Sequence, residues 1–98
     1  MKITQTLDGN KLKLELNGKL MTGNTDELEN IINNNLTDIK ELVLDLSNLE
    51  FVTSAGLKIF LNAHKKLKDK GRMILINAND MVLEIFRITG IIDILNIR

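Results

Sequence analysis

Hydrophobic and polar residues alternate at the start of the chain. Every second residue from position 12 to 16 is a leucine, and a shorter run before it places Ile3 and Leu7 on one face. A period of two predicts β-strands with one buried face. Asp8 and Gly9 lie between the two runs, and this dipeptide is typical of a tight turn because it tolerates positive φ. The pattern therefore predicts an antiparallel hairpin.

Three later segments carry apolar residues at helical spacing. They cover about residues 25–35, 54–70 and 80–89. Each presents an apolar stripe of the kind that a helix buries against a sheet. The stripe of the second segment consists of Leu57, Phe60, Leu61, His64 and Leu67. The sequence therefore predicts three amphipathic helices.

Residues that favour helix ends flank these segments. Asn24 suits the N-cap of the first helix, and Asn79 or Asp80 suits the N-cap of the third. Gly71 and Gly90 fit the positions just past the ends of the second and third helices, where glycine is preferred. These residues support the helix boundaries that the periodicity predicts.

Two apolar runs separate the helices. Glu41–Leu46 and Met73–Ile76 contain few polar residues, which favours strands covered on both faces. We expect a loop at Ser47–Glu50 and a short extended piece at Phe51–Val52. The apolar tail Ile91–Ile97 suits either a last strand or a helical turn.

The order of these elements indicates the fold class. Strands that alternate with helices favour right-handed crossovers and a mostly parallel sheet after the initial hairpin. The chain of 98 residues is long enough for one hydrophobic core and too short for two domains. We therefore expect residues 1–98 to form a single α/β domain, with a mixed sheet flanked by three to four helices.

Charge and composition narrow the functional classes. The 13 basic residues balance the 13 acidic residues, which argues against a broad basic surface for nucleic acid or for a membrane. The absence of cysteine excludes disulfides, zinc–thiolate sites and cysteine nucleophiles. The sequence has no signal-peptide pattern and no apolar run long enough for a membrane helix. We therefore expect a cytoplasmic protein with no direct membrane insertion.

Catalytic chemistry has few candidates. His64 is the one histidine, and its place on an apolar stripe is typical of a partly buried core residue. Gly18 and Gly23 are not followed by the Lys-Ser or Lys-Thr of a phosphate-binding loop. The acidic residues do not alternate as calcium ligands do. The sequence therefore predicts no catalytic residue, no metal and no cofactor, and hence a protein that is not an enzyme.

The junction before the second helix is unusual. Ser54 starts the helix, and the small residues Ala55 and Gly56 follow at once. Glycine in a first turn costs helix propensity, but it allows another group to approach the hydroxyl closely. The local pattern leaves a second interpretation open, in which Thr53 or Ser54 is an ordinary N-cap and Gly56 only packs tightly.

This junction resembles a known signature. The sequence Leu-Val-Leu-Asp-Leu-Ser at 42–47, followed by Ser-Ala-Gly-Leu at 54–57, is similar to that of bacterial STAS-domain anti-sigma-factor antagonists. In that family a strand ends in Asp-Leu-Ser, and a phosphorylatable serine then opens a helix. The resemblance covers nearly the whole chain, including the turn at Gly18–Leu20 and the third helix end at Thr89–Ile91.

The resemblance implies a mechanism. Members of the family bind an anti-sigma factor that is often a serine kinase, and so free a sigma factor for transcription. The kinase phosphorylates the antagonist, which breaks the complex, and a phosphatase resets the switch. By motif position Ser54 is the acceptor, with Thr53 as the alternative.

Two positions depart from the family pattern. Thr53 and Met21 replace aspartates that are common before the acceptor and in the turn before the first helix. Some similar STAS proteins are instead cytoplasmic accessory subunits of lipid-transport ABC systems, in which the serine region is a docking surface, and this alternative stays open. Under either role, the residues expected to contact a partner are Met21, Thr53, Ser54, Ala55, Gly56, Lys58 and Ile59.

Two apolar edges accompany these expectations. Ile59, together with Ala55 and Ala63, lies off the main helical stripe and is a candidate contact for a partner. Met81, Leu83 and Ile88 flank the inward face of the third helix, either as a further edge or as packing against the apolar tail.

Overall fold

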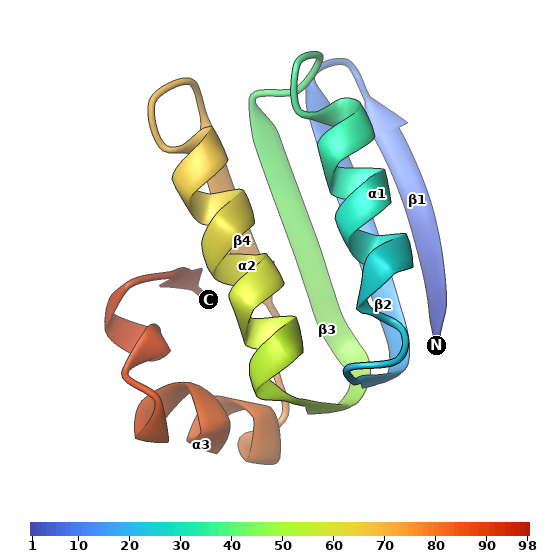
Figure 1. Ribbon diagram of the computed structural model, residues 1–98. Helices are drawn as coiled ribbons and strands as arrows, with labels where there is room; N and C mark the ends of the chain where they lie inside the picture. The colour runs from blue at the N-terminus through green and yellow to red at the C-terminus, as the bar shows by residue number, and fades with distance from the viewer.

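One five-stranded mixed sheet organises the chain, and the computed structural model describes residues 1–98 (Figure 1). The strands follow one another in space as they do in sequence, and only the first pair is antiparallel. The strands are β1 (Lys2–Asp8), β2 (Lys11–Leu20), β3 (Glu41–Val52), β4 (Arg72–Ile76) and β5 (Asn96–Ile97). The helices are α1 (Thr25–Asn35), α2 (Ser54–Leu67), α3 (Asp80–Ile88) and the short 3₁₀ helix η1 (Ile91–Asp93). The predicted α/β class with an N-terminal hairpin and parallel strands is confirmed.

The hydrophobic core lies between the sheet and the helices. In Figure 1, α1 and α2 lie side by side in front of the strands, and α3 lies near the start of α2. The alternating leucines of β2 are buried, as the period of two predicts. Phe60 of α2 meets Phe86 of α3 edge to face, with ring centroids 6.4 Å apart. Burial of one such side chain contributes about 1.5–3 kcal/mol.

The hairpin turn is shifted by one residue from its predicted place. Asp8 pairs with Lys11, so Asp8 is the last residue of β1 and the two turn residues are Gly9 and Asn10. Gly9 has φ +60°, whereas Asn10 does not have a positive φ. Positive φ at the first turn residue alone is typical of a type II′ turn, whose twist suits a hairpin.

Two strands run further than the sequence pattern indicates. The residues expected as a loop, Ser47–Glu50, belong to a continuous β3 that ends at Val52. Gly18–Leu20, expected as a turn, belong to β2. Two register shifts along β2 keep the two strands paired, and Gly18, with φ +115°, adjoins one of them. The expectation of an interrupted third strand was therefore wrong, because cross-strand pairing continues through irregular backbone.

The helix ends agree with the predictions in part. Asn79 caps α3 by accepting a hydrogen bond from Val82 N at 2.8 Å, and Gly90 follows α3 with φ +79°. Asn24 precedes α1, but its side chain makes no capping hydrogen bond. Gly71 lies beyond the turn that follows α2, where a Cβ would overlap the Lys40 carbonyl. Gly71 is therefore needed for a close backbone approach and not for a helix cap.

The apolar tail forms both of the expected elements. A helical turn, η1, comes first, and β5 then adds a short parallel strand next to β4. Ile91 and Leu95 are buried in the core. The three α-helices are each too short or too polar to cross a membrane.

Candidate functional site

Thr53 joins the end of β3 to the start of α2. Its backbone N–H donates to the Leu20 carbonyl at 3.0 Å, and its hydroxyl donates to the same carbonyl at 3.4 Å. The hydroxyl is therefore turned toward β2 and does not cap the helix. The first helical hydrogen bond runs from Leu57 N to Thr53 O at 3.0 Å. This network fixes the position at which α2 begins.

Ser54 is the first residue of α2 and its side chain is exposed to solvent. Its hydroxyl makes no hydrogen bond to another residue, and no side chain caps the helix. The first N–H groups of a helix have no partner within it, so they give this end a partial positive charge. A negative group on Ser54 would lie in a favourable field.

Gly56 is buried under this junction. A Cβ at this position would lie 2.7 Å from side-chain atoms of Leu20 and Val52. The small residue therefore lets the first turn of α2 approach the ends of β2 and β3. Gly56 itself therefore offers little surface for the partner contact that the sequence predicts, because its own strands cover it.

Ile59 is also unavailable to a partner. It is 7% exposed and lies near Ile32 of α1, with Ala63 one turn further along α2. Ala63 is 2% exposed, so the predicted apolar edge does not reach the surface. Ile59 is off the main stripe because α2 buries a second face against α1. Of the three residues of this predicted edge, only Ala55, which is half-buried, keeps some surface.

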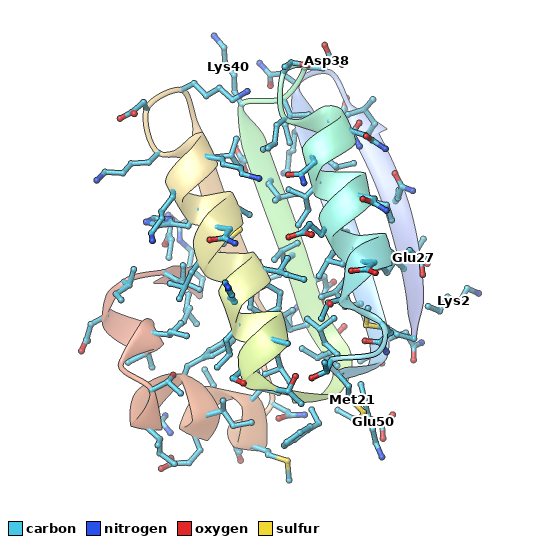
Figure 2. All side chains as sticks on the ribbon, viewed as in Figure 1. Lys2, Met21, Glu27, Asp38, Lys40 and Glu50 are labelled. Carbon is cyan, nitrogen blue, oxygen red and sulfur yellow. The ribbon has the colours of Figure 1, made fainter.

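Met21 lies on an ordered turn between β2 and α1. Asn24 Oδ1 accepts a hydrogen bond from Met21 N at 2.8 Å, and Asn24 Nδ2 donates to Lys19 O at 2.8 Å. These bonds replace the helix cap that the sequence suggests for Asn24. They hold the Met21 side chain at the surface, near the end of the molecule where α2 begins (Figure 2).

An open groove of about 470 Å³ occupies this end of the molecule. Its apolar lining comes from Met21, Phe51 and Met81, which we call the apolar rim. Lys19 and Glu50 complete the lining with one charge of each sign. All three apolar side chains are substantially exposed, although they are large. An exposed apolar cluster that is bordered by polar residues is a candidate protein-binding surface.

The third member of the apolar rim is placed by the start of α3. Asn79 Nδ2 donates to Leu49 O of β3 at 3.0 Å, while its Oδ1 caps α3. This double role ties α3 to the strand that leads to Ser54. Met81 and Ile88 are 57% and 76% exposed, so they do not pack against the tail. The sequence pattern shows that they lie off the inward stripe, but it does not show which surface they join.

The remaining candidates add little chemistry. Lys58 is exposed one turn after Ser54 and forms no ion pair. His64 is half-buried and lies ten residues after Ser54 in the same helix. That separation corresponds to about 15 Å along the helix axis. His64 is therefore too far from the Ser54 hydroxyl to accept its proton.

Comparison with known proteins gives a consistent family. The family described as STAS domain matches residues 2–98. BtrV of Bordetella bronchiseptica, assigned as an anti-sigma factor antagonist, is 30% identical over 96% of this chain and 83% of its own length. The anti-sigma-B factor antagonist of Listeria monocytogenes is 33% identical over 58% of this chain and 51% of its own.

Solved structures share the fold at lower identity. An anti-sigma factor antagonist from Mycobacterium paratuberculosis has a TM-score of 0.86 at 23% identity, over 98% of this chain and 83% of the other. The protein tm1081 of Thermotoga maritima, also assigned as an antagonist, has a TM-score of 0.89 at 20% identity, over 97% and 84%. Phosphorylated SpoIIAA of Bacillus has a TM-score of 0.79 at 17% identity, over 99% and 91%.

The α/β domain with an N-terminal hairpin, parallel strands and covering helices is the fold that these solved structures share with this chain. This chain belongs to the STAS domain family. The relatives described above are named as antagonists, which is a description of binding and not of catalysis. The expectation of a protein that is not an enzyme agrees with this family.

Proposed function

We propose that this protein is an anti-sigma-factor antagonist controlled by phosphorylation of Ser54. In its unmodified form it binds an anti-sigma factor with serine-kinase activity, and the sigma factor is released. The observation that supports this role best is the exposed, unpartnered Ser54 hydroxyl at the start of α2. Two relatives in sequence are named as anti-sigma factor antagonists, which supports the binding part of this proposal.

A phosphoryl group on Ser54 should leave the core undisturbed, because the Ser54 side chain is exposed. Phosphorylation adds a charge of about −1.5 to −2 at pH 7. At Ser54 this charge faces the N–H groups of the first turn of α2, which stabilise an anion. Lys58 follows one turn later and supplies a cation that no other residue engages. The modified domain should therefore stay folded.

The effect of phosphorylation should fall on the complex. Ser54 does not line the groove, but it lies three residues after Phe51 of the apolar rim, so we expect a partner seated on the groove to extend to the hydroxyl. A dianion at that interface must lose its water or meet charges of the partner. Binding is then weakened while the fold is kept, as a reversible switch requires. A phosphatase that removes the group would restore binding.

The first test identifies the modification. The protein is isolated from its native host and its intact mass is measured, followed by location of the modified residue in peptides. We expect one added phosphoryl group on Ser54. A modified Thr53 would support the alternative acceptor, and a protein that is never modified in any growth state would contradict the switch.

The second test measures binding of the kinase that co-purifies with the unmodified protein. Ser54→Ala should abolish labelling by that kinase and ATP but keep binding. Ser54→Asp should raise the dissociation constant by about tenfold or more, which corresponds to about 1.4 kcal/mol. Thr37→Asp, an exposed position after α1, adds the same charge away from the groove and should bind normally.

Two results would overturn the proposal. One is a Ser54→Asp variant that binds as tightly as the wild type. The other is co-purification with a membrane ATPase in place of a soluble kinase, which would favour the transport-accessory role.

A further inference from the structure

The outer edge of β1 has no neighbour in the sheet. β1 pairs with β2 along one side over all seven of its residues, and its other side is the end of the sheet (Figure 1). Six of the seven residues are exposed. An edge strand presents unpaired N–H and C=O groups, which form a template for another strand.

Features that usually protect such an edge are nearly absent from β1. The chain contains no proline, and the pairing of β1 with β2 has no bulge. Leu7 is 59% exposed, although its cross-strand partner Leu12 is buried in the core. Ile3 is half-buried on the same face of β1 as Leu7. The edge is therefore long, regular and partly apolar.

The sequence of β1 is complementary to itself when it is read in the reverse direction. If two copies pair antiparallel about Gln5, Lys2 lies opposite Asp8 and Ile3 lies opposite Leu7. The two threonines, at positions 4 and 6, also face one another. Opposite charges, apolar pairs and threonine pairs are all favourable across antiparallel strands.

Backbone geometry allows this register. Along an edge strand, the N–H and C=O groups of every second residue point outward. Pairing about Gln5 places even-numbered residues opposite even-numbered residues and odd opposite odd. The residues whose backbone groups point outward in one copy therefore face the outward-pointing residues of the other copy. Two neighbouring registers, centred on Thr4 and on Thr6, also satisfy this condition, but each leaves two residues at one end of β1 without a partner. The first leaves Asp8 unpaired and the second leaves Lys2 unpaired, so both lack the charge pairs.

We propose that the β1 edge binds a second copy of this chain, in an antiparallel pair centred on Gln5. The two sheets join into one, with the helices of both copies on the same face. Neighbouring strands are about 4.8 Å apart, so the two β2 strands lie about 14 Å apart. Because α1 lies in front of β2 in Figure 1, the two α1 helices are separated by a similar distance. Packed helices need about 8–10 Å between their axes, so the α1 helices do not collide.

The assembly stops at two copies. The opposite edge of the sheet is β5, which has only two residues and offers little backbone for pairing. A two-fold pair uses the same surface of both molecules and leaves none of that surface free. The reversal of strand direction places the two Ser54 residues at opposite ends of the dimer, and both stay accessible.

The pair should be weak and dependent on concentration, because a single strand contributes a small interface. Sedimentation velocity on the tag-free chain should show the mass rising from 11.1 kDa toward twice that value as concentration increases. The charge pairs give a specific test. Lys2→Asp and Asp8→Lys each place like charges opposite one another twice in a dimer, and each should raise the dissociation constant on the order of tenfold.

An equimolar mixture of the two variants is the decisive sample. In the mixed pair, both acidic positions of the Lys2→Asp chain face both basic positions of the Asp8→Lys chain. The mixture should therefore dimerise as well as the wild type, although each variant alone does not. Circular dichroism checks that both variants keep the hairpin, since Asp8 also lies opposite Lys11 within its own chain.

A second pair of variants tests the apolar contact. Leu7→Lys should prevent dimer formation. Ile88→Lys changes an exposed apolar residue that lies on α3, away from β1, and should leave dimer formation unchanged. A wild-type protein that stays monomeric up to millimolar concentration would overturn the proposal. So would a dimer that persists in Leu7→Lys and in both charge variants. Neither result affects the proposed role of Ser54. That role is tested by phosphorylation and partner binding, whereas dimer formation is tested by sedimentation.

Discussion

Asp45 is the one charged side chain in the buried set, at 7% exposure. Three groups surround its carboxylate: Ser47 N donates to Oδ1 at 3.0 Å, Asn77 Nδ2 donates to Oδ1 at 3.3 Å, and Lys13 Nζ lies 3.7 Å from Oδ2. Asn77 has φ +63° and is the one residue other than glycine with positive φ. The carboxylate therefore ties β3 to the end of β4, where the backbone adopts an uncommon conformation.

The pKa of Asp45 follows from these contacts. Burial alone raises the pKa, but the hydrogen bonds from Ser47 and Asn77 and the charge of Lys13 outweigh it and hold the pKa below its usual value. The folded state therefore binds a proton at Asp45 less readily than the unfolded chain does. Its contribution to stability is complete above the unfolded value of about 3.9 and is lost as pH falls through the lower folded value.

Replacement of the charge should show this dependence. Asp45→Asn keeps the shape of the side chain but removes charge-assisted hydrogen bonds, so we expect a loss of about 1.5–3 kcal/mol at pH 7. The difference from wild type should shrink as pH falls below about 4. Urea unfolding at several pH values measures it, with Asp38→Asn, at an exposed residue, as the control. If the difference in the free energy of unfolding between wild type and Asp45→Asn stayed the same down to the lowest pH, the lowered pKa of Asp45 would be contradicted.

Single residues also show where sequence reasoning reaches its limit. The helical period correctly places Leu57 and Phe60 in the core. The same period leaves Ile59 off the stripe, yet Ile59 is buried because α1 packs against a second face of α2. A pattern along one helix reports the face turned to the sheet. It carries no information about a neighbouring helix that covers another face.

At the scale of elements, the predictions held where periodicity was strong. The hairpin, the three helices and the strand at Met73–Ile76 lie close to their expected bounds. The error at Ser47–Glu50 has a physical cause: polar residues on an exposed stretch of strand look like a loop. Pairing with the end of β2, through two register shifts, keeps that stretch extended. Such pairing depends on partner residues that are more than 30 positions away in sequence.

The contact between α2 and the strands depends on the absence of a side chain at Gly56. Gly56→Ala favours the helix by about 1 kcal/mol in propensity. The new Cβ, however, would lie 2.7 Å from Leu20 and Val52, and overpacking costs about 1–3 kcal/mol. We expect a net loss of stability in urea unfolding, because the propensity gain offsets only part of the overpacking cost.

Gly23→Ala provides the matched control for Gly56→Ala. No atom lies within 4 Å of a Cβ at Gly23, and its φ is not positive, so this change should be neutral or slightly stabilising. Equal effects of the two substitutions would show that the first turn of α2 is not closely packed on β2 and β3.

At the scale of the whole molecule, the fold assembles a surface that no local pattern reveals. The apolar rim takes Met21 from the turn after β2, Phe51 from the end of β3 and Met81 from the first turn of α3. Consecutive members of the rim are 30 positions apart in the chain, so the first and the last are 60 apart. The serine at the same end was predicted from its motif, because the motif is contiguous. The groove at that end requires the sheet order and the link between Asn79 and β3.

This surface leads to a prediction that separates binding from folding. Met81→Lys places a charge on the apolar rim, where a bound partner would have to desolvate it. Because Met81 is largely exposed, the free energy of unfolding should change by less than about 0.5 kcal/mol. The dissociation constant for the kinase-type partner should rise by about tenfold, measured by titration calorimetry with the unphosphorylated protein.

Ile94→Lys is the matched control, because Ile94 is also largely exposed but lies outside the groove. It should leave both stability and partner binding unchanged. If Met81→Lys and Ile94→Lys bound the partner equally well, the groove would not be part of the interface, and Ser54 would have to act through a different face of α2. If both weakened binding, the loss would reflect added positive charge in general. Only a selective loss in Met81→Lys connects the apolar rim to the proposed switch.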